Sequence, residues 1–167
     1  MGDKIRILHL SDLHIPENMM EDNEFKSVKQ RLMADISSQK KRFGDINIIV
    51  FTGDIVNKGH SELFETEELK KFFEDIIRQA GANKENVLLV PGNHDASRPD
   101  ASDIVDKYIT SVRTEQKVTE KPEEVRFLCG RYERFTKFHS QIIGDGSIKN
   151  SYGVRDIVIQ NQVYRFI

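Results

Sequence analysis

Residues 46–54 read INIIVFTGD, an almost unbroken apolar run that ends at a glycine and an aspartate. Isoleucine, valine and phenylalanine dominate the run. A short β-branched stretch without polar alternation is typical of a strand that is covered on both faces, as in the parallel sheets of α/β proteins. The stretch therefore predicts a buried strand over residues 46–51, with Asp54 just beyond its C-terminal end.

Two other stretches have the same design. Residues 4–10 (KIRILHL) predict a strand that is followed by Asp12, and residues 86–90 (NVLLV) predict a strand that leads through a Pro-Gly pair into Asn93. Each predicted strand is thus followed by a side chain that can bind a metal.

Amphipathic helices are predicted between these strands, over residues 24–42 and 61–80, and glycines follow both. Their apolar positions are Phe25, Val28, Leu32 and Ile36 in the first helix, and Leu69, Phe72, Phe73, Ile76, Ile77 and Ala80 in the second. The resulting β-α-β-α-β pattern predicts an α/β fold with a parallel sheet. Polar groups gather at the carboxyl ends of such strands, so the three clusters are expected to converge.

The C-terminal part of the sequence is less regular. We interpret residues 1–167 as part of one domain and residues 99–150 as a lid or helical insertion. Within it, a helix is predicted from Pro122 to about Gly144. Two short strands are predicted over residues 157–159 and 163–167.

Composition restricts the class of protein. Hydrophobic residues make up 38% and charged residues 31%, which is typical of a folded soluble chain. The net charge of −2 does not support a general nucleic-acid partner. No apolar run approaches a membrane span or a signal peptide, so we expect no membrane partner and a cytoplasmic location. Cys129 is the sole cysteine, which rules out a disulfide within these residues.

The polar clusters have the chemistry of a metal site. Asp12 and His14 can direct a carboxylate and an imidazole at one ion, and Asp54 can place its two oxygens on two metals. Asn93 adds an amide oxygen, while His94 beside it is available for proton transfer. Alone, the first two clusters are weak signals that usually mark ordinary turns, and the third also fits a loop of turn residues. Their common position after three strands favours a shared site.

In order and combination, residues 11–14 (SDLH), 53–57 (GDIVN) and 92–95 (GNHD) resemble the first three motifs of the calcineurin-like metallophosphoesterase family. The resemblance implies an α/β/β/α sandwich, of which this sequence is the first, truncated half. It also implies two divalent cations, manganese, iron or zinc, and a bridging hydroxide that attacks a phosphate-ester substrate.

The resemblance further assigns roles to individual residues. Asp12 and His14 would bind one metal, Asp54 would bridge both, and Asn93 would bind the second. The catalytic pair would be His94, at the scissile phosphate or leaving group, and Asp95, which would orient His94.

Other residues near the motifs have more than one interpretation. Arg98 can bind a substrate phosphate through its planar fork or be a plain surface charge. Among the remaining histidines, we predict that His9 is buried and structural, that His60 lies in a loop and that His139 packs on a helix. None of the three is placed in the site.

The leading prediction is hydrolysis of phosphomonoesters or phosphodiesters by a protein of which this sequence supplies the first-half ligands, the fragment alone being inactive or weakly active. The family pattern requires further histidines from a missing C-terminal half, and none follows His139. A non-catalytic metal-binding scaffold or regulator is therefore the alternative. Within the enzymes, a nuclease is a further reading. The identities of substrate and metal stay open.

Overall fold

The computed structural model describes residues 4–59, 62–97, 130–144, 155–160 and 162–166. The main elements are β1 (Ile7–Leu10), α1 (Asn23–Phe43), β2 (Ile48–Thr52), α2 (Glu67–Ala80), β3 (Val87–Val90), α5 (Glu133–Ile143), β4 (Arg155–Ile159) and β5 (Gln162–Phe166). Two 3₁₀ turns, Glu62–Glu65 and Lys84–Asn86, flank α2. No helix in these ranges has both the length and the apolar character needed to cross a membrane.

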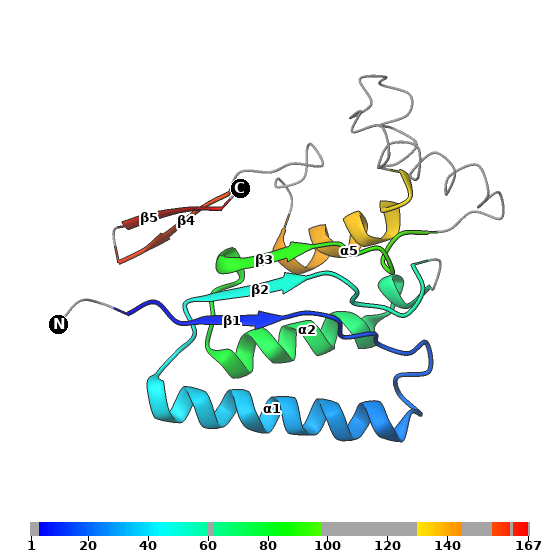
Figure 1. Ribbon diagram of the computed structural model, residues 1–167, viewed down its shortest axis with the longest axis horizontal. Coiled ribbons are helices and arrows are strands. Elements are labelled where there is room, and N and C mark those ends of the chain that lie inside the picture. The colour runs from blue at the N-terminus through cyan, green and yellow to red at the C-terminus, as the bar shows by residue number, and fades with distance from the viewer. Residues whose placement is uncertain (1–3, 60–61, 98–129, 145–154, 161, 167) are drawn as a thin grey trace, which may run out of the picture.

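The first three strands form a parallel sheet in the order β1-β2-β3, which confirms the predicted β-α-β-α-β arrangement. β1 and β3 lie on opposite sides of β2, and both pair with it in parallel, so all three strands point the same way (Figure 1). Their C-terminal ends therefore meet at one edge of the sheet. The strands are shorter than predicted at their N-terminal ends, where β1 begins at Ile7 rather than at residue 4.

Local capping accounts for the limits of α1 and α2. The Asp22 side chain accepts a hydrogen bond from the backbone N–H of Phe25 at the start of α1. Thr66 does the same for Leu69 in α2, where Gly81 ends the helix in the left-handed conformation. The predicted apolar stripe of α1 was wrong at Val28, which is 55% exposed because α1 packs along α2 rather than directly on the sheet.

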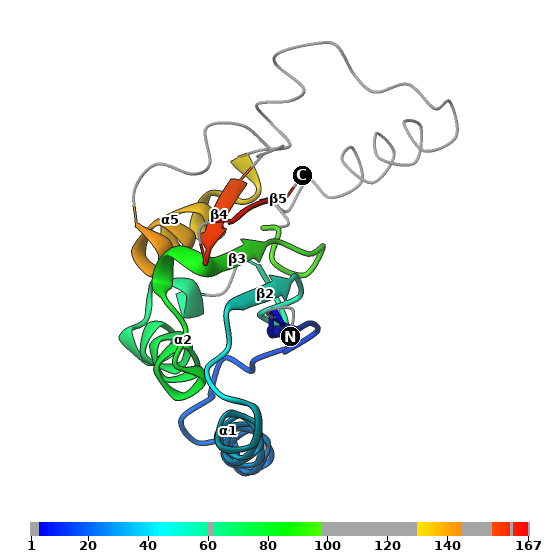
Figure 2. The same ribbon diagram turned by 90° about the vertical axis from the view of Figure 1, so that its left-hand side faces the viewer.

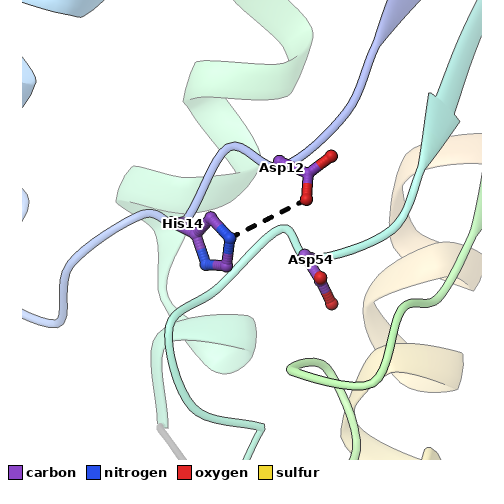
Figure 3. A group of neighbouring side chains, drawn as sticks. All are labelled: Asp12, His14 and Asp54. Carbon is purple, nitrogen blue, oxygen red and sulfur yellow. Dashed lines mark ion pairs between the residues drawn. The ribbon is translucent and has the colours of Figure 1, made fainter.

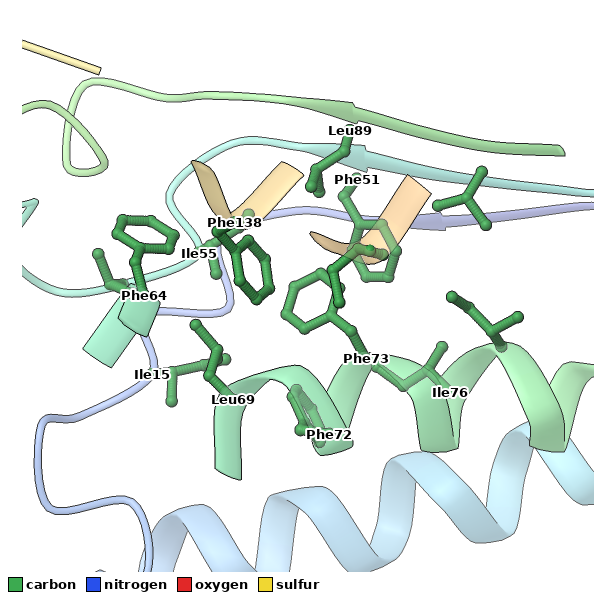
Figure 4. Packing of buried hydrophobic residues seen from close by; sticks show 14 of the residues in the cluster. Ile15, Phe51, Ile55, Phe64, Leu69, Phe72, Phe73, Ile76, Leu89 and Phe138 are labelled. Atoms are coloured by element: carbon green, nitrogen blue, oxygen red, sulfur yellow. The ribbon is translucent and has the colours of Figure 1, made fainter. Parts of the chain in front are cut away.

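The main core lies between the sheet and the helices (Figure 4). The buried ring of Phe73 on α2 lies 4.5 Å from that of Phe51 on β2 and 5.0 Å from that of Phe138 on α5. Strand residues Ile49 and Leu89 belong to the same cluster. Three helices and one sheet face thus share a single core, which holds the three strand ends in place.

The opposite face of the sheet is partly covered by the antiparallel hairpin of β4 and β5 (Figure 2). Ile157 and Ile159 of β4 pack with Ile48 of β2 in a second, smaller cluster. The layers are therefore helices, parallel sheet and a second sheet, the first part of the expected sandwich. The hairpin turns about one residue earlier than predicted, with Gln160 at a φ of 52°.

The segment predicted as an insertion is only partly described. Residues 98–129 and 145–154, including the N-terminal part of the predicted helix, lie outside the described residues. The described part contains α5, whose Phe135 and Phe138 are buried in the main core. For the rest of residues 99–150 the lid interpretation stays a prediction.

The substitution Phe73→Ala should lower the free energy of unfolding by about 3–5 kcal/mol, because it removes a buried ring and leaves a cavity. Val28→Ala is the control, since that side chain is exposed on α1 and should change stability by less than about 0.5 kcal/mol. Urea titration of both variants measures the difference. Equal effects would contradict the central position of Phe73.

Candidate metal centre

Three loops follow the three parallel strands: the first loop (residues 11–15), the second loop (residues 53–57) and the third loop (residues 91–97). The first two run side by side. The N–H of His14 donates to the carbonyl of Asp54 at 2.9 Å, and Ile15 forms a parallel bridge with Val56. The sheet register is thus extended into the loops, and the predicted ligands face one another.

Two glycines let the second and third loops approach closely. A Cβ at Gly53, where φ is 86°, would come within 2.6 Å of the backbone of Gly92. A Cβ at Gly92 would collide with the Asp54 carboxylate and come within 2.5 Å of the Asp54 backbone nitrogen. Only glycine allows this contact, because any larger residue would push the loops apart.

The fully buried carboxylate of Asp95 joins the same two loops. Its Oδ1 accepts hydrogen bonds from the backbone N–H groups of Ile55 at 2.8 Å and Val56 at 3.1 Å, and its Oδ2 accepts one from Gly92 at 2.8 Å. Burial raises the pKa of Asp95 above its ordinary value, the three hydrogen bonds oppose this rise, and the charge of Asp54 adds to it. Asp95 is therefore a structural clamp between the loops.

Asp12, His14 and Asp54 converge at the edge of the sheet (Figure 3). Each offers one ligand atom, and these atoms lie within 4.8 Å of one another. The His14 Nε2 is 3.9 Å from Asp12 Oδ1. Asp12 is exposed while the other two are half-buried, so the group is open to solvent. Two carboxylates and an imidazole suit manganese, iron or zinc, and this donor set fits the divalent cations that the motifs imply.

The backbone is strained at all three of these residues. Asp12, His14 and Asp54 have φ values of 54°, 44° and 51°, in the left-handed region that residues other than glycine rarely adopt. Such conformations cost roughly 1–3 kcal/mol each and persist where the surrounding structure holds them. Their coincidence on the three residues of one cluster points to a functional site.

Asn93 and His94 lie on the third loop beside this group. The backbone N–H of His94 donates to Asp54 Oδ1 at 2.9 Å, and the His94 and His14 rings meet edge to face with centroids 4.9 Å apart. Asn93 is exposed, between Gly92 and His94. The convergence of the third loop with the first two is thus present, while metal ligation by Asn93 stays a prediction.

The orientation of His94 differs from the one predicted. Its Nδ1 lies 2.9 Å from the carbonyl oxygen of Asn57, whereas the hydrogen bonds of Asp95 go to the backbone as described above. A carbonyl oxygen can only accept, so Nδ1 carries the hydrogen. The ring is therefore oriented by the second loop, and Asp95 acts on the position of the third loop instead.

The other candidate residues have different outcomes. Arg98 and His60 lie outside the described residues. His9 is exposed rather than buried, because its side chain projects from the sheet face away from the helices, and its Nε2 lies 2.7 Å from the Thr52 hydroxyl. His139 is 5% exposed and packs near the Phe135 ring, which confirms its predicted packing role.

Sequence reasoning missed the contacts of Ser11. Its hydroxyl can donate its single hydrogen to the Asp12 carboxylate or, at 3.4 Å, to the carbonyl of Thr52. Ser11 therefore lies between the first ligand and the end of β2. The signal was a hydroxyl residue directly before a candidate ligand, which is too common in turns to stand alone.

The comparisons with known proteins agree with this geometry. Residues 5–164 match the calcineurin-like phosphoesterase family, and the chain belongs to that family. It is also similar to an uncharacterized metallophosphoesterase-like protein, YydB, from Bacillus subtilis (strain 168), with 36% identity over 95 residues. That match covers 57% of this chain but 18% of the relative. No solved structure matches the chain significantly.

The Asp12→Gly variant of the protein should be more stable than the Asp12→Ala variant. Asp12→Gly and Asp12→Ala both remove the carboxylate, so their difference isolates the left-handed backbone, which costs alanine roughly 1 kcal/mol more than glycine. Urea unfolding with a chelator present measures this difference. Asp35, in the middle of α1, is the matched control. There the Asp35→Ala variant should be more stable than the Asp35→Gly variant by about 1 kcal/mol, because glycine is unfavourable inside a helix. Alanine being more stable at both positions would contradict the strained geometry.

Removing the clamp should destabilise the fold. Asp95→Ala leaves three backbone N–H groups without their acceptor, and we expect a loss of roughly 3 kcal/mol or more. Asp95→Asn keeps one acceptor oxygen and should lose less. Thermal and urea unfolding of both variants measure the order, and an Asp95→Ala variant as stable as the native chain would refute the clamp.

Proposed function

We propose that this chain supplies the first-half ligands of a two-metal site that hydrolyses phosphomonoesters or phosphodiesters. The observation that carries the proposal is the convergence of Asp12, His14 and Asp54, from the ends of two different strands, with their ligand atoms within 4.8 Å of one another. The family assignment adds that metal-dependent phosphoester hydrolysis is the activity of this class of protein.

In the proposed site, Asp12 and His14 hold one metal and Asp54 lies between the two. Asn93 contributes its amide oxygen to the second metal. Two bound cations would supply a hydroxide near neutral pH and neutralise the charge of the phosphate oxygens. The divalent ions that fit this donor set include manganese, which is the first to test.

His94 is the proposed proton-transfer residue. Because its Nδ1–H is directed at the carbonyl of Asn57, Nε2 is the nitrogen that can exchange a proton with the substrate or the leaving group. Its half-buried ring beside His14 is close to the proposed metal ligands. Asp95 supports this role by holding the third loop, and Arg98, four residues beyond His94, is the proposed contact for a substrate phosphate.

The remaining ligands are proposed to come from a C-terminal half of the domain. The family pattern includes further histidines, and the matched stretch makes up only 18% of the relative from Bacillus subtilis. A cytoplasmic location belongs to the same proposal and rests on the pattern of apolar runs described in the sequence analysis. The near-neutral net charge of −2 is the reason to test small phosphate esters before nucleic acids.

Asp54→Ala should abolish the proposed activity. Loss of a ligand shared by both metals should reduce hydrolysis of a chromogenic phosphodiester by at least about a hundredfold, since even outer partners of a metal commonly contribute 10–100-fold. The assay uses manganese, the 167-residue chain and its longest natural form. Asp45→Ala is the control, because Asp45 precedes β2 at the opposite end of that strand.

The outcomes separate the alternatives. Activity unaffected by Asp54→Ala would refute the mechanism. Manganese binding without hydrolysis of phosphate esters in either form would favour a scaffold or regulator. Hydrolysis of single-stranded or duplex DNA in preference to small esters would identify a nuclease.

A further inference from the structure

Ser97, the last residue of the third loop, forms three hydrogen bonds with other segments. Its N–H donates to the carbonyl of Arg131 at 2.7 Å, and its own carbonyl accepts from the Arg131 Nε at 3.1 Å. Its hydroxyl donates to the carbonyl of Gly59 at 3.0 Å. Ser97 therefore connects the third loop both to the segment that follows the second loop and to the residue that leads into α5.

The contact with Gly59 is part of a tight backbone stack. A Cβ at Gly59 would collide with the backbone of Asp95 and Ala96, and all three of these residues are buried. The backbone at Gly59 thus lies directly against the backbone of the third loop, with no side chain between them. A small displacement of Ser97 would therefore be passed along the third loop toward His94.

Arg131 acts from a rigid support. It lies two residues before α5, and the first turns of that helix are anchored by Phe135 and Phe138, whose rings pack against Phe64 with centroids 6.0 and 5.5 Å apart. Tyr132 is also packed against the main core. The backbone of Arg131 is consequently fixed by the core, and its side chain extends that support to Ser97.

In the first part of the third loop, two backbone N–H groups donate hydrogen bonds to carboxylates. The N–H of Gly92 is bound by Asp95, and the N–H of His94 is bound by Asp54. Asp54 is a proposed metal ligand, so a bound cation would change the charge around its hydrogen bond with the His94 N–H. The hydrogen bonds of Ser97, at the end of the loop, involve no proposed ligand. They can hold the loop in both the metal-free and the metal-bound protein.

We propose that Arg131 is a positioning residue for the metal centre, whose Nε–H holds the Ser97 carbonyl and so fixes the loop that carries Asn93 and His94. Its expected effect on the order of the third loop rests on the hydrogen bonds between Arg131 and Ser97 and does not require a bound metal. Its effect on the second metal, through Asn93, rests on the proposed function. Arg131 acts through Ser97 and has no assigned contact with metal or substrate.

Two substitutions of matched length test the hydrogen bond. In Arg131→Gln the side-chain amide nitrogen stands at the same number of bonds from the backbone as Nε, so the donor is kept and the charge is lost. Arg131→Met places a methyl group there and removes the donor. Lys137→Met is the control, because Lys137 lies on α5 and pairs with Glu133 on the surface.

The first readout is amide hydrogen exchange by NMR in the metal-free protein. Arg131→Met should accelerate exchange at the His94 N–H by about tenfold or more, with exchange in β2 and α2 unchanged, because only the loop opens more often. Arg131→Gln and Lys137→Met should remain close to the native rates. Unchanged exchange at His94 in Arg131→Met, or equal acceleration in the Met and Gln variants, would overturn the inference.

The second readout is manganese titration of the longest natural form. Arg131→Met should weaken the second binding event by about 10–100-fold and leave the first unchanged, as is usual for residues that orient a ligand. Arg131→Gln should restore the second affinity. Native second-site affinity in Arg131→Met would overturn this consequence. If the native protein binds no second manganese, the proposed function fails while hydrogen exchange still decides the role of Arg131.

Discussion

The buried carboxylate of Asp95 is the interaction on which the arrangement of the ligand loops depends. It binds backbone N–H groups of the second loop through one oxygen and the start of the third loop through the other. This bridge is possible because Gly53 and Gly92 lack side chains where the two loops touch. Together with the hydrogen bond from the His94 N–H to Asp54, the bridge holds the loop that carries Asp54 against the loop that carries His94.

The site combines a stable scaffold with a strained edge. Phenylalanines from β2, α2 and α5 pack in one core, and the parallel strands deliver their ends to one side of the sheet. At that edge the three clustered candidate ligands all have positive φ values. The strain is retained because hydrogen bonds between adjacent loops hold the backbone in place. The candidate ligand atoms are therefore close together without a bound cation.

Much of this could be predicted from local sequence patterns. The apolar run of β2, the 3.6-residue periodicity of α2 and the order of the three motifs indicated the sheet, its direction and the side chains at its edge. These features depend on neighbouring residues, so the sequence displays them directly. The convergence of Asp12 with Asp54 then followed from parallel topology.

Features that depend on distant contacts could not be predicted. The exposure of His9 reflects which face of β1 lacks helices, and the exposure of Val28 reflects the packing of α1 on α2. The orientation of His94 by the Asn57 carbonyl depends on a contact between residues 37 positions apart. A backbone acceptor leaves no trace in side-chain identity, so the family resemblance, which implied Asp95 as the partner of His94, gave no sign of the Asn57 carbonyl.

The proposed function requires that Asp12, His14 and Asp54 bind a divalent cation at the end of the parallel sheet. Crystals soaked in manganese, with diffraction data collected near the manganese absorption edge, test it most directly. We expect an anomalous peak about 2 Å from a carboxylate oxygen of Asp12, an imidazole nitrogen of His14 and a carboxylate oxygen of Asp54. A fully resolved loop cluster without such a peak, or a peak bound by other residues, would contradict it.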